Sequence, residues 1–262
     1  SKKQSGPDPE HLRLRNNHIW ENSRRYHGYK SEFSFPDDQE TTAGIVWPYL
    51  AAGKPFIAPL DLPLKKNTKI LDVPARSGAW IYSLLDSHDG TYAKARVTGL
   101  EPAWMVGDAG PAWLLHRDLE GPWPFTAKEA FHLIHGGALG GLLKDGDGFY
   151  ANVFKHLVPW GWVEIREHDL RFCPRGGKEK EMEGKWDAIK QRSDLIDKAA
   201  QKFGKRITWG YSLRLFTKSL GWSKEDTDDL LELALQELDQ EDLQLYSLFY
   251  FVVRRKPTSA AK

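Results

Sequence analysis

The chain has 262 residues, of which 40% are apolar and 28% are charged, and its 37 Lys and Arg residues nearly balance 36 Asp and Glu residues. This composition predicts a globular chain with a buried core and excludes a disordered one, while a net charge of +1 excludes a general electrostatic field for nucleic acid. The single cysteine, Cys173, excludes a disulfide framework and a zinc site built from several cysteines.

Hydropathy and aromatic content indicate the setting and the kind of ligand. No apolar run is long enough for a membrane helix, and the polar first residues lack the apolar segment of a secretory signal. We therefore expect no membrane insertion and a reducing, cytoplasmic setting, with the nucleus also open. The 11 tryptophans suggest either a core rich in aromatic side chains or a bulky apolar ligand. Six of them fall near predicted strand ends and are candidates to line one cavity: Trp80, Trp104, Trp113, Trp123, Trp160 and Trp162.

In chain order, the first predicted unit is an N-terminal arm, residues 1–45. Residues 1–19 are polar, and the basic, aromatic stretch that follows alternates poorly and is interpreted as an ordered arm. Residues 40–52 have helical spacing, although Pro48 would shorten or kink that helix.

The second predicted unit, residues 46–175, alternates short apolar runs with helices. Strands are predicted at 69–73, 95–101, 130–135 and 162–166, and helices at 78–85 and 149–157. Strand, helix and strand with short connections indicate a parallel sheet with crossover helices, which is an α/β fold.

The third predicted unit, residues 176–262, is a helical cap with a final strand that completes the sheet. Helices are predicted at 186–203, 211–220 and 230–238, the last with Ser223 as its N-cap and an acidic first turn. The run from Tyr246 to Val253 is the strongest strand signal in the chain.

The loop after the first predicted strand carries the pattern of a nucleotide-type site. Asp72 ends the strand, Gly78 opens the helix, and Glu101 ends the next strand. Small residues in such a loop let the backbone approach a ligand, and an acid on the next strand can bond ribose hydroxyls. As a bare pattern it is equally compatible with a purely structural turn.

Several segments taken together resemble the fungal LaeA-like class I methyltransferases. The resemblance covers about residues 20–257 and rests on residues 22–30, 70–73, 78–80, 97–101, 117–124, 131–135, 156–164 and 220–223 and on the final run 250–257. It implies a Rossmann-like methyltransferase sheet and a site for S-adenosylmethionine (SAM). In that site Asp72, Gly78 and Glu101 would hold the cofactor, and Asp118 would lie on the adenine side.

Two departures from that family put the SAM site in doubt. Pro74 and Arg76 stand at two of the three loop glycines; Pro74 fixes φ, and an arginine stem would occupy the volume where the methionine part of SAM lies. In addition, the sixth strand expected between Phe203 and Tyr246 is missing. We expect SAM binding to be lost, unless Arg76 points to solvent and SAM still binds.

Four side chains are candidates for catalysis. His135 ends a strand, where the following Gly136 and Gly137 would widen a pocket; it is either a hydrogen-bond donor or general base, or a satisfied structural histidine. Glu164 and His168 follow the carboxyl half of the fifth strand, although Glu164 could equally pair with Arg166. Tyr26 could cover the pocket from the arm, or lie on a solvated surface.

Three functions remain open from the sequence. The first is a repurposed methyltransferase fold that binds a hydrophobic small molecule and promotes its cyclisation or rearrangement without a cofactor, such as an intramolecular Diels–Alder reaction in fungal secondary metabolism. The second is an active SAM-dependent methyltransferase. The third is a non-enzymatic regulator. No nucleic-acid partner or metal site is expected, and the oligomeric state stays open.

Overall fold

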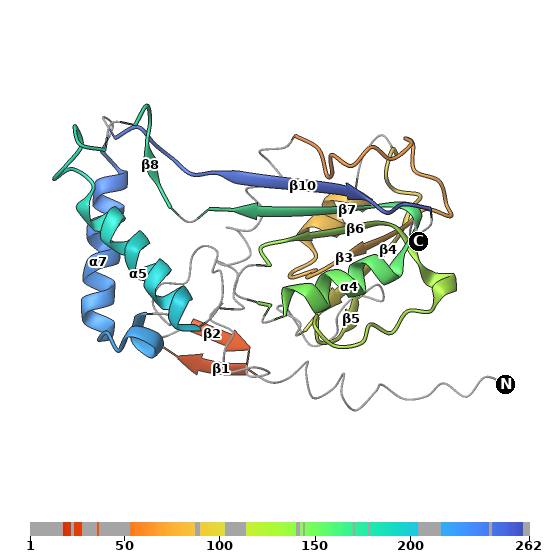
Figure 1. The fold of residues 1–262 in the computed structure, drawn as a ribbon, viewed down its shortest axis with the longest axis horizontal. Helices are drawn as coiled ribbons and strands as arrows, with labels where there is room; N and C mark the ends of the chain where they lie inside the picture. Colours follow the sequence, from red (N-terminus) through yellow and green to blue (C-terminus); the bar gives the residue numbers. More distant parts are fainter. Residues whose placement is uncertain are drawn as a thin grey trace.

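The computed structural model describes a central sheet, a separate pair of helices and a short hairpin (Figure 1). The residues it describes are 18–21, 24–27, 36, 53–86, 90–102, 114–139, 142–143, 145–169, 171–177, 179–203, 216–240 and 243–258. The helix predicted at 40–52, as well as Trp104 and Trp113, lies outside these residues.

The central sheet has six strands in the order β10-β7-β6-β3-β4-β5. Their bounds are β3 Lys69–Asp72, β4 Arg96–Glu101, β5 Leu114–His116, β6 Phe131–Gly137, β7 Leu157–His168 and β10 Phe249–Arg255. All neighbours are parallel except β10, which runs antiparallel to β7. A parallel sheet that ends in an antiparallel C-terminal strand is the class I methyltransferase type that the resemblance implies, so the predicted fold class is confirmed.

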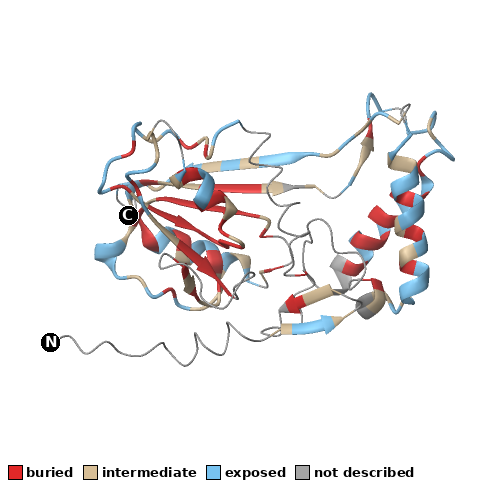
Figure 2. Ribbon diagram, turned by 180° about the vertical axis from the view of Figure 1, so that it is seen from behind, coloured by how far each residue is buried: buried red, intermediate tan, exposed pale blue. Residues whose placement is uncertain are grey.

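Helices cover both faces of this sheet and build two apolar clusters. Helix α3 (Ala79–Leu85) packs on one face with Ile70, and helix α4 (Gly146–His156) packs on the other with Leu71, because successive side chains of a strand point to opposite faces. Figure 2 shows the inner strands of the sheet as largely buried, whereas the edge strand β10 is exposed or intermediate. Both helices were predicted within a few residues, and α4 begins where the Asp145 carboxylate accepts a hydrogen bond from the Gly148 N–H at 2.9 Å.

The helical part lies apart from the sheet and has a core of its own. Helix α5 (Asp187–Phe203) packs against α7 (Lys224–Leu238), and the π-helical turn η2 (Phe216–Leu220) joins them. Ser223 is the N-cap of α7 as predicted, since its hydroxyl accepts from the Asp226 N–H at 2.9 Å. Of the helix predicted at 211–220, the structure describes only η2.

Several short elements were not predicted. These are β1 (His18–Glu21) and β2 (Arg24–His27), which form an antiparallel hairpin; β5; the 3₁₀ turn η1 (Ala127–Glu129); and β8 (Cys173–Pro174) paired with β9 (Leu245–Tyr246). The strand predicted from 246 to 253 is therefore two strands, β9 and β10. Within the described residues, nothing pairs with the outer edge of β10, and none of the helices is long and apolar enough to cross a membrane.

Candidate functional site

Three strands bring their acidic and basic ends together at the carboxyl edge of the sheet. The register places Asp72 of β3 beside His135 of β6, and His135 beside Glu164 of β7. Glu101 ends β4 on the other side of β3. Ligands of open α/β sheets bind beyond this edge, so the candidate site stays at the edge where the sequence predicts it.

The loop from β3 to α3 keeps the backbone of a glycine loop without most of its glycines. Gly78 has a φ of 76°, and Arg76 has a φ of 51°, in the left-handed region where a side chain costs about 1–2 kcal/mol. Pro74 follows Val73 in the same loop. The Arg76 N–H donates to a Glu101 carboxylate oxygen at 2.8 Å, so the acid expected at a ribose already accepts a hydrogen bond from the loop.

The Arg76 side chain lies across the gap between two strand ends. The residue is 5% exposed, and its guanidinium donates to the carbonyl oxygen of Ala138, just after β6, at 2.8 Å. Arg76 therefore does not point to solvent. Strands β3 and β6 are neighbours whose following helices, α3 and α4, cover opposite faces, which makes this gap the switch point of the sheet, where a ligand crevice is expected.

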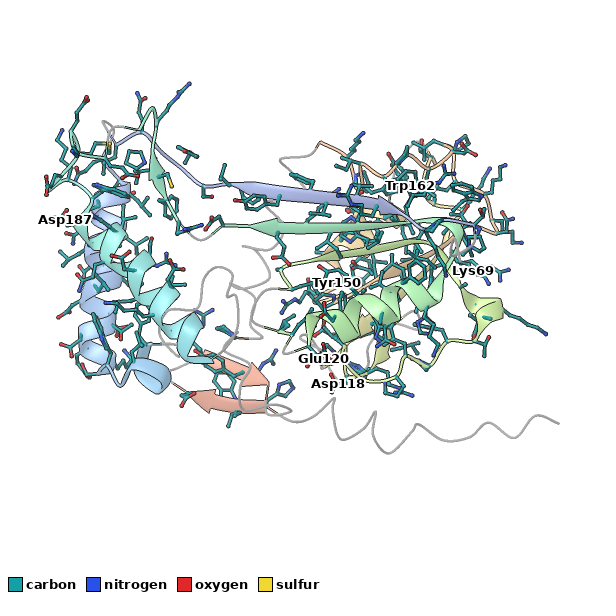
Figure 3. The ribbon with its side chains drawn as sticks, in the orientation of Figure 1. Lys69, Asp118, Glu120, Tyr150, Trp162 and Asp187 are labelled. Atoms are coloured by element: carbon teal, nitrogen blue, oxygen red, sulfur yellow. The ribbon has the colours of Figure 1, made fainter. Side chains whose placement is uncertain are left out.

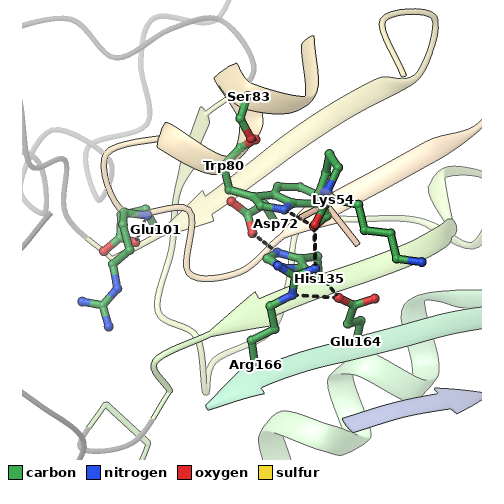
Figure 4. Close-up of polar contacts among 10 residues, drawn as sticks. Lys54, Asp72, Trp80, Ser83, Glu101, His135, Glu164 and Arg166 are labelled. Atoms are coloured by element: carbon green, nitrogen blue, oxygen red, sulfur yellow. Dashed lines mark hydrogen bonds and ion pairs between the residues drawn. The ribbon is translucent and has the colours of Figure 1, made fainter. Parts of the chain in front are cut away.

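His135 and Asp72 form a buried pair beneath an indole ring. His135 Nδ1 lies 2.8 Å from Asp72 Oδ1, and the Trp80 ring stacks on the imidazole with centroids 3.9 Å apart at 3° (Figure 4). Burial, followed by Arg166, lowers the pKa of His135 well below its usual value, so the ring is neutral. Burial, followed by Glu101, raises the pKa of Asp72 well above its usual value, although Arg166 and Arg76 oppose that rise.

Glu164 belongs to a buried ion pair with Arg166. One carboxylate oxygen accepts from Arg166 Nε at 2.8 Å and lies 2.7 Å from the Arg166 Nη2, and the other accepts the backbone N–H groups of Ile57 and Ala58 at 2.8 and 2.7 Å. Both oxygens are thus occupied within the protein. The pairing with Arg166 is confirmed, and a catalytic role of Glu164 stays a prediction.

The ion pair also holds Trp80 in place through one backbone carbonyl. The Pro55 carbonyl oxygen accepts from Arg166 Nη2 at 2.8 Å and from Trp80 Nε1 at 2.6 Å. The segment 54–58 is therefore fixed to β7 and to α3 at once. Sequence reasoning missed this segment because it lies about a hundred residues from Glu164, but the placement of Glu164 and Arg166 two apart on one strand face was a usable signal.

The other predicted residues are less closely grouped. Tyr26 is buried in β2, which pairs with β1 and not with the central sheet, so it does not lie on a solvated surface. His168 is the last residue of β7 and pairs with Phe249 of β10. Asp118 follows β5 and accepts the Glu120 N–H at 3.1 Å. The structure brings together Asp72, Arg76, Gly78, Glu101, His135 and Glu164.

Two predictions about an apolar chamber are corrected. A Cβ on Gly136 would lie 2.5 Å from the Val73 carbonyl oxygen, so this glycine allows close strand packing and does not widen a pocket. Trp162 lies at the amino end of the sheet, near Lys69, and Trp160 precedes it on β7 (Figure 3). Trp123 is buried in the core against His156. Of the described tryptophans proposed as lining, Trp80 alone lies at the carboxyl edge.

No cluster of metal-ligating side chains occurs among the described residues.

Comparison with known proteins confirms the resemblance found in the sequence. No family model matches the chain. The chain is 22% identical to "Methyltransferase pytC" of Aspergillus terreus, over 91% of this chain and 88% of that protein. It is 25% identical to "Secondary metabolism regulator LAE1" of Hypocrea atroviridis, over 89% of this chain and 63% of that protein. The chain is thus a methyltransferase-fold protein related to proteins of fungal secondary metabolism.

Solved structures similar to the chain are methyltransferases as well. Phosphoethanolamine N-methyltransferase 2 of Haemonchus contortus, solved with S-adenosyl-L-methionine, is 12% identical over 89% of this chain and 62% of that one, with a TM-score of 0.42. A putative methyltransferase of Bacillus halodurans is 14% identical over 74% of this chain and 95% of that one, with a TM-score of 0.40.

Proposed function

We propose that this chain has lost SAM-dependent methylation and promotes a cyclisation or rearrangement, such as a Diels–Alder cycloaddition, of a hydrophobic intermediate in fungal secondary metabolism. The observation that carries the proposal is the Arg76 side chain, which reaches from the β3–α3 loop, at the switch point of the sheet, to the Ala138 carbonyl. The residues present do not fit SAM, because this side chain fills the space that a glycine would leave to the cofactor.

The surrounding acids support the same conclusion. Glu101 accepts from the Arg76 N–H, and Asp72 is hydrogen-bonded to His135. One oxygen of each carboxyl group is thus already in a hydrogen bond of 2.8 Å, which a cofactor would have to share or displace. Each displaced hydrogen bond costs about 0.5–1.5 kcal/mol, which corresponds to a loss of up to about tenfold in affinity.

The same features suit a reaction that consumes no co-substrate. A cycloaddition needs its two reacting parts held in contact, and a donor aimed at a substrate carbonyl withdraws electron density from it. Arg76 is the group at the crevice with several N–H donors, and we assign it the binding of such a carbonyl. His135 is fully buried, so we assign it a positioning role through Asp72 and Trp80 instead of contact with substrate.

The experiment is native mass spectrometry of the purified chain after incubation with a fungal metabolite extract, alongside an assay for methyl transfer from labelled SAM. Retention of an apolar small molecule by the wild type and its loss in Arg76→Ala, with no label transferred, is the expected result. Arg96→Ala, at an exposed position at the amino end of β4, is a matched arginine control that should retain the ligand.

An active SAM-dependent methyltransferase is the second candidate. It is favoured by Gly78, which keeps its positive φ at the start of α3, and by the backbone of Arg76, which still follows the course of a glycine loop. This candidate requires the Arg76 side chain to swing out of the crevice. Label transfer from SAM to any metabolite in the same assay would establish it and would contradict the loss of methylation.

A further inference from the structure

β10 presents an exposed, apolar outer edge. It forms one edge of the central sheet in Figure 1 and pairs with β7 over its whole length without a break in register. Tyr250 is 46% exposed and Val252 is 50% exposed. Among the described residues no strand lies along its outer side.

The backbone of β10 divides its hydrogen-bonding groups between the two edges. The Leu248 carbonyl accepts the Asp169 N–H at 2.7 Å, and the Lys256 N–H donates to the Gly161 carbonyl at 2.8 Å. The backbone groups of Leu248 and Lys256 therefore point toward β7. Alternate residues of a strand point their N–H and C=O groups to the same side. Phe251 and Val253 therefore direct their N–H and C=O groups to the outer edge.

The first part of β10 lacks the usual protection of an edge strand. Natural edges carry charged side chains (above all lysine), a proline or a bulge that hinders pairing with another strand. β10 contains no proline, lysine or bulge, and its two charged residues, Arg254 and Arg255, stand at its end. The apolar stretch before them is a template for one more strand.

We propose that a second copy of this chain pairs along this edge, with β10 antiparallel to β10 about a two-fold axis at Val252. In this register Phe251 of each copy lies opposite Val253 of the other, so their outward N–H and C=O groups exchange hydrogen bonds. The two sheets then form one continuous sheet, and the two-fold axis closes the assembly as a dimer.

The charges of β10 select this register. Arg255 already lies over the rings of Trp160 and Trp162 on one face of the sheet, at 4.5 and 5.2 Å. Arg254 is exposed on the other face. An axis at Val252 places Arg254 opposite Tyr250 of the second copy, which gives the guanidinium an aromatic ring. Moving the axis by one residue would place Arg254 opposite Val252 or Leu248 and remove that contact.

The first test is sedimentation velocity of the full chain across a range of concentrations. We expect a species of twice the 29.9 kDa chain mass that forms with a dissociation constant of about 10 μM, as suits a small interface. Val253→Pro removes an outward N–H without touching the β7 ladder and should abolish the dimer. Arg254→Glu should weaken it at least tenfold. Arg96→Glu, an exposed arginine on β4, should leave it unchanged.

The second test locates the axis and does not depend on folding of the proline variant. Val252 of one copy faces Val252 of the other, so Val252→Cys in a Cys173→Ser background should form a disulfide-linked dimer on mild oxidation. The matched control is Leu233→Cys on α7, which is 54% exposed and should link much more slowly. A chain that is monomeric at all concentrations, or equal linking at both positions, would overturn the proposal.

Discussion

Asp72 and Glu164 are two buried carboxyl groups on either side of His135, yet their surroundings give them different properties. Glu164 accepts hydrogen bonds from the Arg166 guanidinium and from two backbone N–H groups. Asp72 is hydrogen-bonded to the neutral imidazole of His135, and burial raises the pKa of Asp72. The position of an acid at the carboxyl edge of a sheet therefore does not determine its properties. They depend on how many hydrogen-bond donors surround its carboxyl group and on the charge of those donors.

The largest expected effect comes from Glu164→Gln. The amide removes the negative charge from a pair whose side chains are at most 1% exposed and leaves the Arg166 guanidinium buried without its counter-ion. We expect the free energy of unfolding to fall by about 3–5 kcal/mol, measured by urea denaturation. Glu232→Gln on the exposed face of α7 is the control and should leave the curve unchanged. A loss as small as that of the control would show that the ion pair does not hold segment 54–58.

A smaller effect is expected from Trp80→Phe. Phenylalanine keeps a ring above His135 but cannot donate to the Pro55 carbonyl, which is 2.6 Å from Trp80 Nε1. The lost hydrogen bond should reduce the free energy of unfolding by about 1 kcal/mol, with a further loss from the smaller ring. Trp160→Phe, at an exposed position on β7, is the matched control. Equal losses in the two variants would mean that the carbonyl does not connect Trp80 to β7.

The smallest effect, and the most informative in sign, is expected from Asp72→Asn. Because the pKa of Asp72 is raised, its contribution to stability is present below the ordinary value of 3.8 and is lost as pH rises through its folded pKa. Asparagine cannot ionise and escapes that loss. The melting temperature of the variant minus that of the wild type should therefore increase from pH 4 to pH 8.

The lowered pKa of His135 acts on both proteins alike. It makes each less stable as pH falls below 6.5, because the unfolded chain gains a proton that the folded chain does not bind. It should largely cancel when the two proteins are compared at each pH. If the variant instead loses stability relative to wild type as pH rises, ionisation of Asp72 stabilises the folded chain, which contradicts a raised pKa of Asp72.

Short apolar runs made most strands of the sheet predictable, whereas the contacts between distant segments could not be predicted from the sequence. β3, β4, β6 and β7 were found because each carries a buried run of β-branched and aliphatic residues. β5 has three residues, too few to show a period, and the β1–β2 hairpin is polar and alternates poorly. The sequence placed Asp72, His135 and Glu164 at strand ends, but it could not show that segment 54–58 would occupy both oxygens of Glu164.

The central claim is that the Arg76 side chain excludes SAM from the crevice between β3 and β6, and titration calorimetry with SAM tests it most directly. We predict no heat of binding for the wild type at SAM concentrations of about 1 mM, and binding at least tenfold tighter for Arg76→Gly, since glycine empties the crevice and accepts the φ of 51° without strain. Micromolar SAM binding by the wild type that Arg76→Gly leaves unchanged would contradict the account.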